Sequence, residues 1–231
     1  MVVSINQPAY LPWLGYFDRI IKSDIHIILD NVQFEKNSVI NRNKIVTDTS
    51  WTWLTVPVKT KGKFGDLEIK ELKIDETSKW RKKHYNSLNH YYGKSKYFRE
   101  HKTWLNYFYD KEWDYLYPLL EESTDYFLET LGIKTPRVRS SKMSVKGNKS
   151  KYLLNICLEI GATTYLSGPF GKDYLKLDEF KKEGIKVIFH KYENPNYQQL
   201  IQNFQNNMSI VDLIFNEGPK SLEILTGRLN K

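Results

Sequence analysis

The sequence predicts an α/β protein with a Rossmann-like, mostly parallel sheet, a helical insert and a short antiparallel element. Short runs of β-branched and apolar residues alternate with segments whose apolar residues recur at helical spacing. A block of purely helical patterns interrupts this alternation between residues 78 and 132. The length of 231 residues suits a single α/β domain over residues 1–231, with residues 78–132 as an insert within it.

The chain starts with a β-loop-α-β pattern. Residues 2–6 form a β-branched run that ends before Pro8, residues 14–22 have apolar side chains at helical spacing, and residues 25–30 are a continuous apolar run typical of a buried parallel strand. Residues 51–58 alternate as a strand does. After a Lys- and Gly-rich loop at 60–66, we expect residues 67–74 to pair with that strand in an antiparallel element.

The remaining elements follow from the same periodicities. The insert contains three helical patterns, at 78–93, 97–111 and 117–132. After it, the α/β alternation returns with strands at 135–141, 163–168 and 184–190 and helices at 149–162, 178–183 and 209–219. The second half therefore repeats the β-α-β organisation of the start.

Composition limits the classes of function. The net charge is +8, but 27 acidic residues accompany 35 basic ones, which disfavours nucleic acid as a partner and suits a small phosphate-bearing ligand. The single cysteine, Cys157, lies in an apolar helical stripe and excludes a multi-cysteine zinc site, and the five histidines form no metal-binding pattern. No stretch reaches the roughly 18–20 apolar residues that span a bilayer, and no secretory leader precedes residue 6. We expect a cytoplasmic protein without a bound metal.

Three polar or aromatic loops follow predicted strands. Ligands of open parallel sheets bind beyond the carboxyl ends of the strands, so we expect these loops to converge there. The loop at 6–13 presents Asn6, Gln7, Tyr10 and Trp13; the loop at 30–43 presents Asp30, Gln33, Asn41, Arg42 and Asn43; the loop at 167–174 presents Ser167, Gly168, Lys172 and Tyr174.

The residue types of these loops indicate their chemistry. Asp30 ends an apolar strand, where its carboxylate is placed to act as a general base. Arg42 offers bidentate binding to phosphate, and its neighbouring asparagines can both donate and accept hydrogen bonds. Gly168 permits close backbone approach and Lys172 suits phosphate, although the loop lacks the spacing of a P-loop. His84, after the basic run at 79–83, is a second candidate for proton transfer, because its expected pKa lies near neutrality.

Six segments, taken in order, closely resemble the WbqC-like family: INQPAYLPWLGYF, LDNVQF with NRN, WLTVPV, KWRKKHYNSL, YLSGPFGKDYL and SIVDLIFNEGP. The likeness covers nearly the whole chain. It implies a role in the biosynthesis of bacterial O-antigen and related polysaccharides, with transfer of glycine to an amino sugar. Family members commonly carry His before the first Gln-Pro, where this chain has Asn6. Proton transfer is therefore assigned to Asp30 or His84, and binding to Asn6 and Gln7.

The leading hypothesis is an aminoacyl- or acyltransferase that joins a small acid, such as glycine, to the amine of a nucleotide-linked amino sugar. Asn41 and Gln7 would polarise the acyl oxygen, and Arg42 and Lys172 would hold the diphosphate. The donor stays open among ATP with a free amino acid, aminoacyl-tRNA and an acyl thioester. Two other classes stay open: a non-catalytic protein that binds a sugar nucleotide or lipid carrier, and an RNA-binding module.

Overall fold

The computed structural model describes residues 1–60 and 67–227. Its centre is a five-stranded sheet with the strand order β5-β2-β1-β6-β7, in which every neighbouring pair is parallel. The strands are β1 (Val2–Asn6), β2 (Ile25–Ile28), β5 (Arg137–Arg139), β6 (Thr164–Ser167) and β7 (Lys186–Phe189). The predicted α/β class with a mostly parallel sheet is confirmed.

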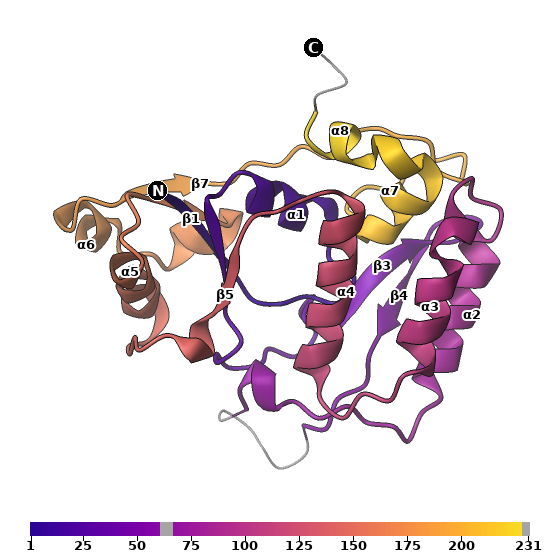
Figure 1. The fold of residues 1–231 in the computed structure, drawn as a ribbon, viewed down its shortest axis with the longest axis horizontal. Helices are drawn as coiled ribbons and strands as arrows, with labels where there is room; N and C mark the ends of the chain where they lie inside the picture. Colours follow the sequence, from indigo (N-terminus) through magenta and orange to yellow (C-terminus); the bar gives the residue numbers. More distant parts are fainter. Residues whose placement is uncertain (61–66, 228–231) are drawn as a thin grey trace.

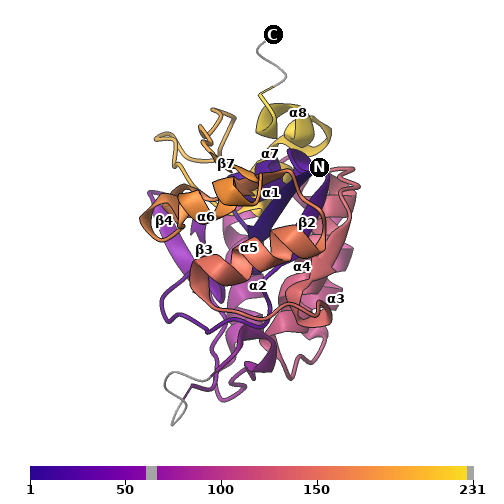
Figure 2. The same ribbon diagram turned by 90° about the vertical axis from the view of Figure 1, so that its left-hand side faces the viewer.

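One face of the sheet is covered by α5 (Lys149–Glu159) and α6 (Leu177–Lys182), which lie in front of it in Figure 2. Val3, Ile5 and Ile27 point to this face, because alternate residues of a strand share a face, and they pack against apolar residues of both helices. Cys157 belongs to this cluster and is fully buried, as the sequence predicted.

The opposite face carries α1 (Leu14–Ile21), and the other α-helices lie beyond it, away from α5 and α6 (Figure 1). Phe17 of α1 meets Phe127 of α4 with ring centroids 6.5 Å apart, within one hydrophobic cluster that extends to α7. These further helices are α2 (Trp80–Tyr92), α3 (Lys102–Asp110), α4 (Leu116–Thr130), α7 (Ile210–Glu217) and α8 (Ser221–Leu225). Among the described residues, no helix is both long and apolar enough to cross a bilayer.

Short 3-10 helices connect several of these elements. They are η1 (Ile69–Glu71), η2 (Phe98–His101), η3 (Ser140–Lys142), η4 (Pro169–Asp173) and η5 (Gly218–Lys220). Two of them, η3 and η4, directly follow the carboxyl ends of β5 and β6. They therefore shape the edge of the sheet at which parallel-sheet proteins bind their ligands.

The antiparallel element differs from the prediction in its partners. Strand β4 (Trp51–Thr55) pairs with β3 (Arg42–Val46), a segment whose start was predicted to be a loop. Residues 67–74 contain η1 and form only isolated bridges, such as the antiparallel bridge between Val58 and Ile74. Ile45 and Leu54 are buried in the core, so the hairpin buries one face and exposes the other. Most of the predicted loop at 60–66 lies outside the described residues.

Gly15, in the first turn of α1, leaves room for the indole of Trp13. A Cβ at this position would lie 2.1 Å from the Trp13 ring. That ring also packs edge-on against Tyr192, with centroids 5.6 Å apart, so it cannot move without losing this contact. We expect Gly15→Ala to lower the free energy of unfolding by about 1–3 kcal/mol, as overpacking does. Urea unfolding measures this, and a cost below about 0.5 kcal/mol, the range of ordinary surface substitutions, would contradict it.

Candidate functional site

The carboxyl edge of the sheet carries a polar residue at or just beyond the end of every strand. The sheet order reverses between β1 and β6, because β2 continues the sheet on one side of β1 and β6 on the other. Such a switch point is where open parallel sheets bind ligands. The edge residues are Asn6 at the end of β1, Asp30 after β2, Ser140 after β5, Ser167 at the end of β6 and His190 after β7.

The first two predicted loops contact each other directly. The backbone N–H of Tyr10 donates to the carbonyl of Ile40 at 3.0 Å, and Nδ2 of Asn43 donates to the carbonyl of Leu11 at 2.7 Å. The third loop joins them less closely: the phenol of Tyr174 interacts electrostatically with Glu35 of the second loop. Residues near positions 10, 40 and 170 therefore approach one region, with the tightest contact between the first two.

Two buried donors at the switch point have no acceptor. Asn6 is only 7% exposed, and its Nδ2 has no hydrogen-bond partner; the same holds for Nε of Arg19 in α1. A Cβ on Gly168 would lie 2.4 Å from Nη1 of Arg19, so the guanidinium lies against the backbone of Gly168. The β1–β6 ladder ends at the pair of Ser4 and Leu166, and Asn6 and Gly168 each lie two residues beyond it, at the same edge of the sheet. Both donors thus lie at the carboxyl edge of β1 and β6.

A carboxylate–histidine pair lies beside these donors. Nε2 of His190 is 2.6 Å from Oδ2 of Asp18, and the backbone N–H of His190 donates to the carbonyl of Ser167 at 2.8 Å. Asp18 also forms an ion pair with Lys22 at 2.6 Å. Because a carboxylate oxygen accepts, Nε2 of His190 is the donor in this pair. Within the described part of the chain, Nδ1 has no hydrogen-bond partner.

Asp212 fixes the irregular segment that leads from His190 back to α7. Its Oδ2 accepts from the Tyr197 hydroxyl at 2.7 Å and from Nε2 of Gln199 at 2.6 Å. Burial raises the pKa of Asp212 from 3.8 to about 6, and those two hydrogen bonds oppose the rise.

The raised pKa of Asp212 predicts a pH dependence of stability. Since the folded state binds the proton more tightly than the unfolded state, the free energy of unfolding should fall as pH rises from about 4 to 6, by up to about 3 kcal/mol. Asp212→Asn should flatten this part of the curve, because its amide carries no titrating proton. Urea unfolding over this pH range measures both proteins, and equal slopes would contradict the assignment.

Asp30 is fully buried and saturated with donors. Its carboxylate accepts from Nε of Arg139 at 2.9 Å, from the backbone N–H and the hydroxyl of Ser141 at 2.9 and 2.6 Å, and from the hydroxyl of Ser140 at 3.2 Å. Burial favours the neutral acid, but the Ser141 and Arg139 hydrogen bonds outweigh it and lower the pKa of Asp30. The carboxylate therefore joins β2 to η3 as an anion.

The other predicted residues of the second loop form contacts within the protein. Nδ2 of Asn41 donates to the carbonyl of Val56 at 2.8 Å, while its Oδ1 is buried without a partner. Arg42 donates to the carbonyl of Asn37 and stacks on Trp53, 4.3 Å from the ring centroid. Gln33 accepts from the backbone N–H of Leu67 at 3.1 Å. These contacts hold the loop against β3, β4 and η1.

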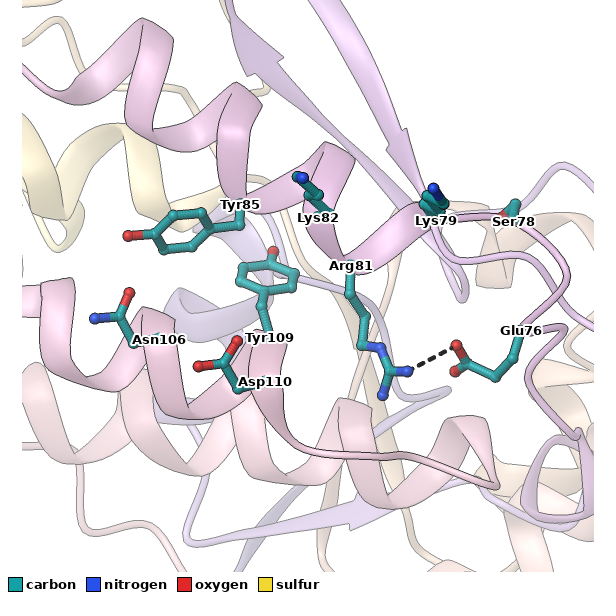
Figure 3. Close-up of a pocket in the computed structure, with 9 residues that line it drawn as sticks. All are labelled: Glu76, Ser78, Lys79, Arg81, Lys82, Tyr85, Asn106, Tyr109 and Asp110. Atoms are coloured by element: carbon teal, nitrogen blue, oxygen red, sulfur yellow. Dashed lines mark ion pairs between the residues drawn. The ribbon is translucent and has the colours of Figure 1, made fainter.

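His84 lies in the helical part, next to a cleft of about 500 Å³ between α2 and α3 (Figure 3). Tyr109 lines this cleft, its hydroxyl is 2.7 Å from that of Tyr10, and the Tyr10 hydroxyl is 2.9 Å from Nδ1 of His84. Burial lowers the pKa of His84 to about 3, so the ring is neutral at pH 7, in contrast to the near-neutral pKa expected from the sequence. Tyr10 and His84 thus join the first loop to α2 and α3.

The remaining predicted residues vary in exposure. Ser167 is buried and its hydroxyl donates to the carbonyl of Gly168 at 3.2 Å, while Trp13 is half-buried against Tyr192. Gln7 is half-buried, and Lys172 and Tyr174 are exposed. Among these, Tyr174 is the one whose phenol interacts with Arg19.

The sequence analysis missed Asp18, Arg19 and His190. Asp18 and Arg19 are the only charged residues among the apolar ones of residues 14–21, and Arg19 could have been noted because it has no acidic residue at i+3 or i+4 to pair with. His190 directly follows the apolar run of β7. A charged or polar residue within or directly after an apolar run thus indicates a side chain that the fold places near the sheet.

The fold and this edge define an α/β protein with a Rossmann-like parallel sheet and a polar site at its switch point. The chain belongs to the WbqC-like protein family, whose model matches residues 7–224. It is 36% identical over 225 residues to the "Uncharacterized protein Rv1507c" of Mycobacterium tuberculosis, a match that covers 96% of each chain. No solved structure matches the chain.

Proposed function

We propose that this protein is a transferase of bacterial surface-polysaccharide biosynthesis that forms an amide on the amine of a nucleotide-linked amino sugar, with an aminoacyl or acyl group such as glycyl as the transferred unit. Family membership supports the pathway. The observation that carries the reaction class is the His190–Asp18 pair at the switch point, because such a pair is suited to proton transfer.

His190 is the proposed base. An amino sugar is protonated near pH 7, and its ammonium must lose a proton before nitrogen can attack an acyl carbon. Nδ1 of His190 would take that proton while Asp18 accepts from Nε2 and stabilises the imidazolium. The C–N bond then forms and the bond from the acyl carbon to the donor oxygen or sulfur breaks. The imidazolium passes its proton to the leaving group, and the neutral ring then takes the second proton of the attacking nitrogen and releases it to water, which leaves the amide with one N–H.

The two bases expected from the sequence are less suited to this step. All four protein donors of Asp30 would have to be displaced before a substrate could reach either oxygen. His84 is engaged at Nδ1 by Tyr10, and its low pKa makes it a weak proton acceptor. His190 combines an unpartnered ring nitrogen with a carboxylate that orients the ring.

Incubation with dTDP- and UDP-linked amino sugars and the three donor classes, followed by mass spectrometry, tests the proposal. We expect the nucleotide sugar to gain the mass of one acyl group. Each donor is tested separately: ATP with a free amino acid, aminoacyl-tRNA and an acyl thioester. If no donor produces a mass gain while a nucleotide sugar still binds, the protein is instead a non-catalytic binding protein of the pathway.

A further inference from the structure

Arg19 is a cation without a counterion in a largely enclosed position. Among the residues that the structure describes, it forms no ion pair and no hydrogen bond to the protein, and its Nε is buried without a partner. Asp18, its sequence neighbour, is already engaged by His190 and Lys22. A buried donor without an acceptor is costly, so such groups occur mainly where a ligand or water completes them.

A second unpartnered donor lies at the same edge of the sheet. Nδ2 of Asn6 is buried without an acceptor, and both Asn6 and Gly168, against which Nη1 of Arg19 lies, follow the Ser4–Leu166 pair of the β1–β6 ladder by two residues. The acidic groups that interact with the guanidinium are the phenols of Tyr165, Tyr16 and Tyr174, and burial raises the pKa of each of them, so they stay neutral. Burial and the positive charges of Arg19 and Arg137 keep the pKa of His26 well below its usual value, so that ring is neutral.

We propose that Arg19 and Asn6 form an anion-binding pocket at Gly168 that holds a phosphate group of the nucleotide-linked sugar. The identity of that ligand rests on the proposed function, whereas the preference for an anion rests on the two donors. A guanidinium and an amide N–H₂ together offer hydrogen bonds that match phosphate oxygens. The pocket is next to the His190–Asp18 pair, so a sugar carried on that phosphate would lie near the proposed base.

Arg42 and Lys172, the basic residues predicted from the sequence to bind phosphate, are less suited to this role. Nε of Arg42 is also buried without a partner, but its guanidinium already donates to the Asn37 carbonyl and covers Trp53, and it lies in β3, outside the five-stranded sheet. Lys172 is an exposed side chain of η4, and an exposed ammonium gives little specificity. We therefore assign the phosphate contact to Arg19 of α1 in place of Arg42 and Lys172.

Isothermal titration calorimetry with UDP and with inorganic pyrophosphate, at fixed ionic strength, tests the pocket. We expect the unmodified protein to bind both probes, and Arg19→Gln to weaken both by roughly tenfold or more, as loss of a charged hydrogen-bonding group does. Arg99→Gln is the matched control, because it removes the same charge from an exposed position in η2. Asn6→Ala should weaken binding to a smaller extent. Thermal unfolding of each variant verifies that it is folded.

Arg19→Lys keeps the charge but loses the planar guanidinium. It replaces Arg19→Gln in the titrations if Arg19→Gln does not fold. Intermediate affinity supports the pocket. Equal affinities of Arg19→Gln and Arg99→Gln, or no binding of either probe to the unmodified protein at millimolar concentration, would overturn it. The outcomes also separate the two proposals. Arg19-dependent binding without any acyl transfer supports the anion-binding pocket and contradicts the transferase. Acyl transfer that is insensitive to Arg19 supports the transferase and contradicts the pocket.

Discussion

His190→Gln is expected to reduce the rate of amide formation by about 100-fold to 10,000-fold, the usual contribution of a positioned acid–base residue. Glutamine can still donate a hydrogen bond to Asp18, but it cannot accept a proton at neutral pH. Since His190 is 5% exposed, the substitution could also disturb packing. The measurement is therefore kcat for the substrate pair that the mass-spectrometric screen identifies, together with the thermal unfolding of the same preparation.

Two companion variants separate catalysis from structure. His90→Gln is the matched control, because His90 is an exposed residue of α2 whose ring forms a long ion pair with Asp48, at 3.8 Å, and an edge contact with Tyr91. It should leave kcat unchanged. Asp18→Asn should lower kcat and shift the acidic limb of the kcat–pH profile, because an amide orients the ring without stabilising the imidazolium. An unchanged kcat in His190→Gln would remove His190 from the mechanism, whatever the stability of the variant.

Most elements of the fold could be predicted because their sequence pattern is local. The apolar runs of β1, β2 and β6 and the helical spacing of α1, α5 and α7 each match an element of the structure. Strand β3 was missed because its first residues, Arg42 and Asn43, read as polar loop residues. Their side chains stabilise a strand here only through contacts with residues distant in sequence. Asn43 donates to the carbonyl of Leu11, and Arg42 stacks on Trp53. Pairing of this kind is set by tertiary contacts and not by propensity.

The site was harder to predict than the fold for a related reason. Polar residues in loops after strands attract attention, yet several of them, such as Asn43 and Asp30, bind other parts of the chain. Asp18 and Arg19 lie in α1, whose apolar residues at helical spacing are explained by packing in the core, so its two charged residues did not stand out. Their importance depends on where β7 and Gly168 are placed in the fold, and a strand order such as β5-β2-β1-β6-β7 cannot be read from one sequence. Unsatisfied donors become visible only once that order is known.

Asp30→Ala is expected to be the most destabilising of the substitutions considered, with a loss of about 3 kcal/mol in the free energy of unfolding. It removes a fully buried carboxylate and leaves the donors of Arg139 and Ser141 without their acceptor. Arg139 would also lose its ion pair, although it keeps its position over the Tyr117 ring at 4.3 Å. Urea unfolding measures the loss, and Ser141→Ala, which removes one donor, should cost about 1 kcal/mol.

Asp30→Asn distinguishes an anchoring role from a catalytic one. The amide is isosteric and can still accept at its oxygen, but its N–H₂ faces donors, so an intermediate loss of stability is expected. If Asp30 only anchors η3, the folded fraction of this variant should transfer the acyl group at nearly the rate of the unmodified protein. If Asp30 were the base instead, the stability would fall modestly while kcat fell by 100-fold or more, as for any lost acid–base group. Because the lowered pKa of Asp30 keeps it ionised throughout the neutral range, its replacement is expected to leave the limb of the kcat–pH profile near neutrality in place, and the size of kcat is the measurement that separates the two roles.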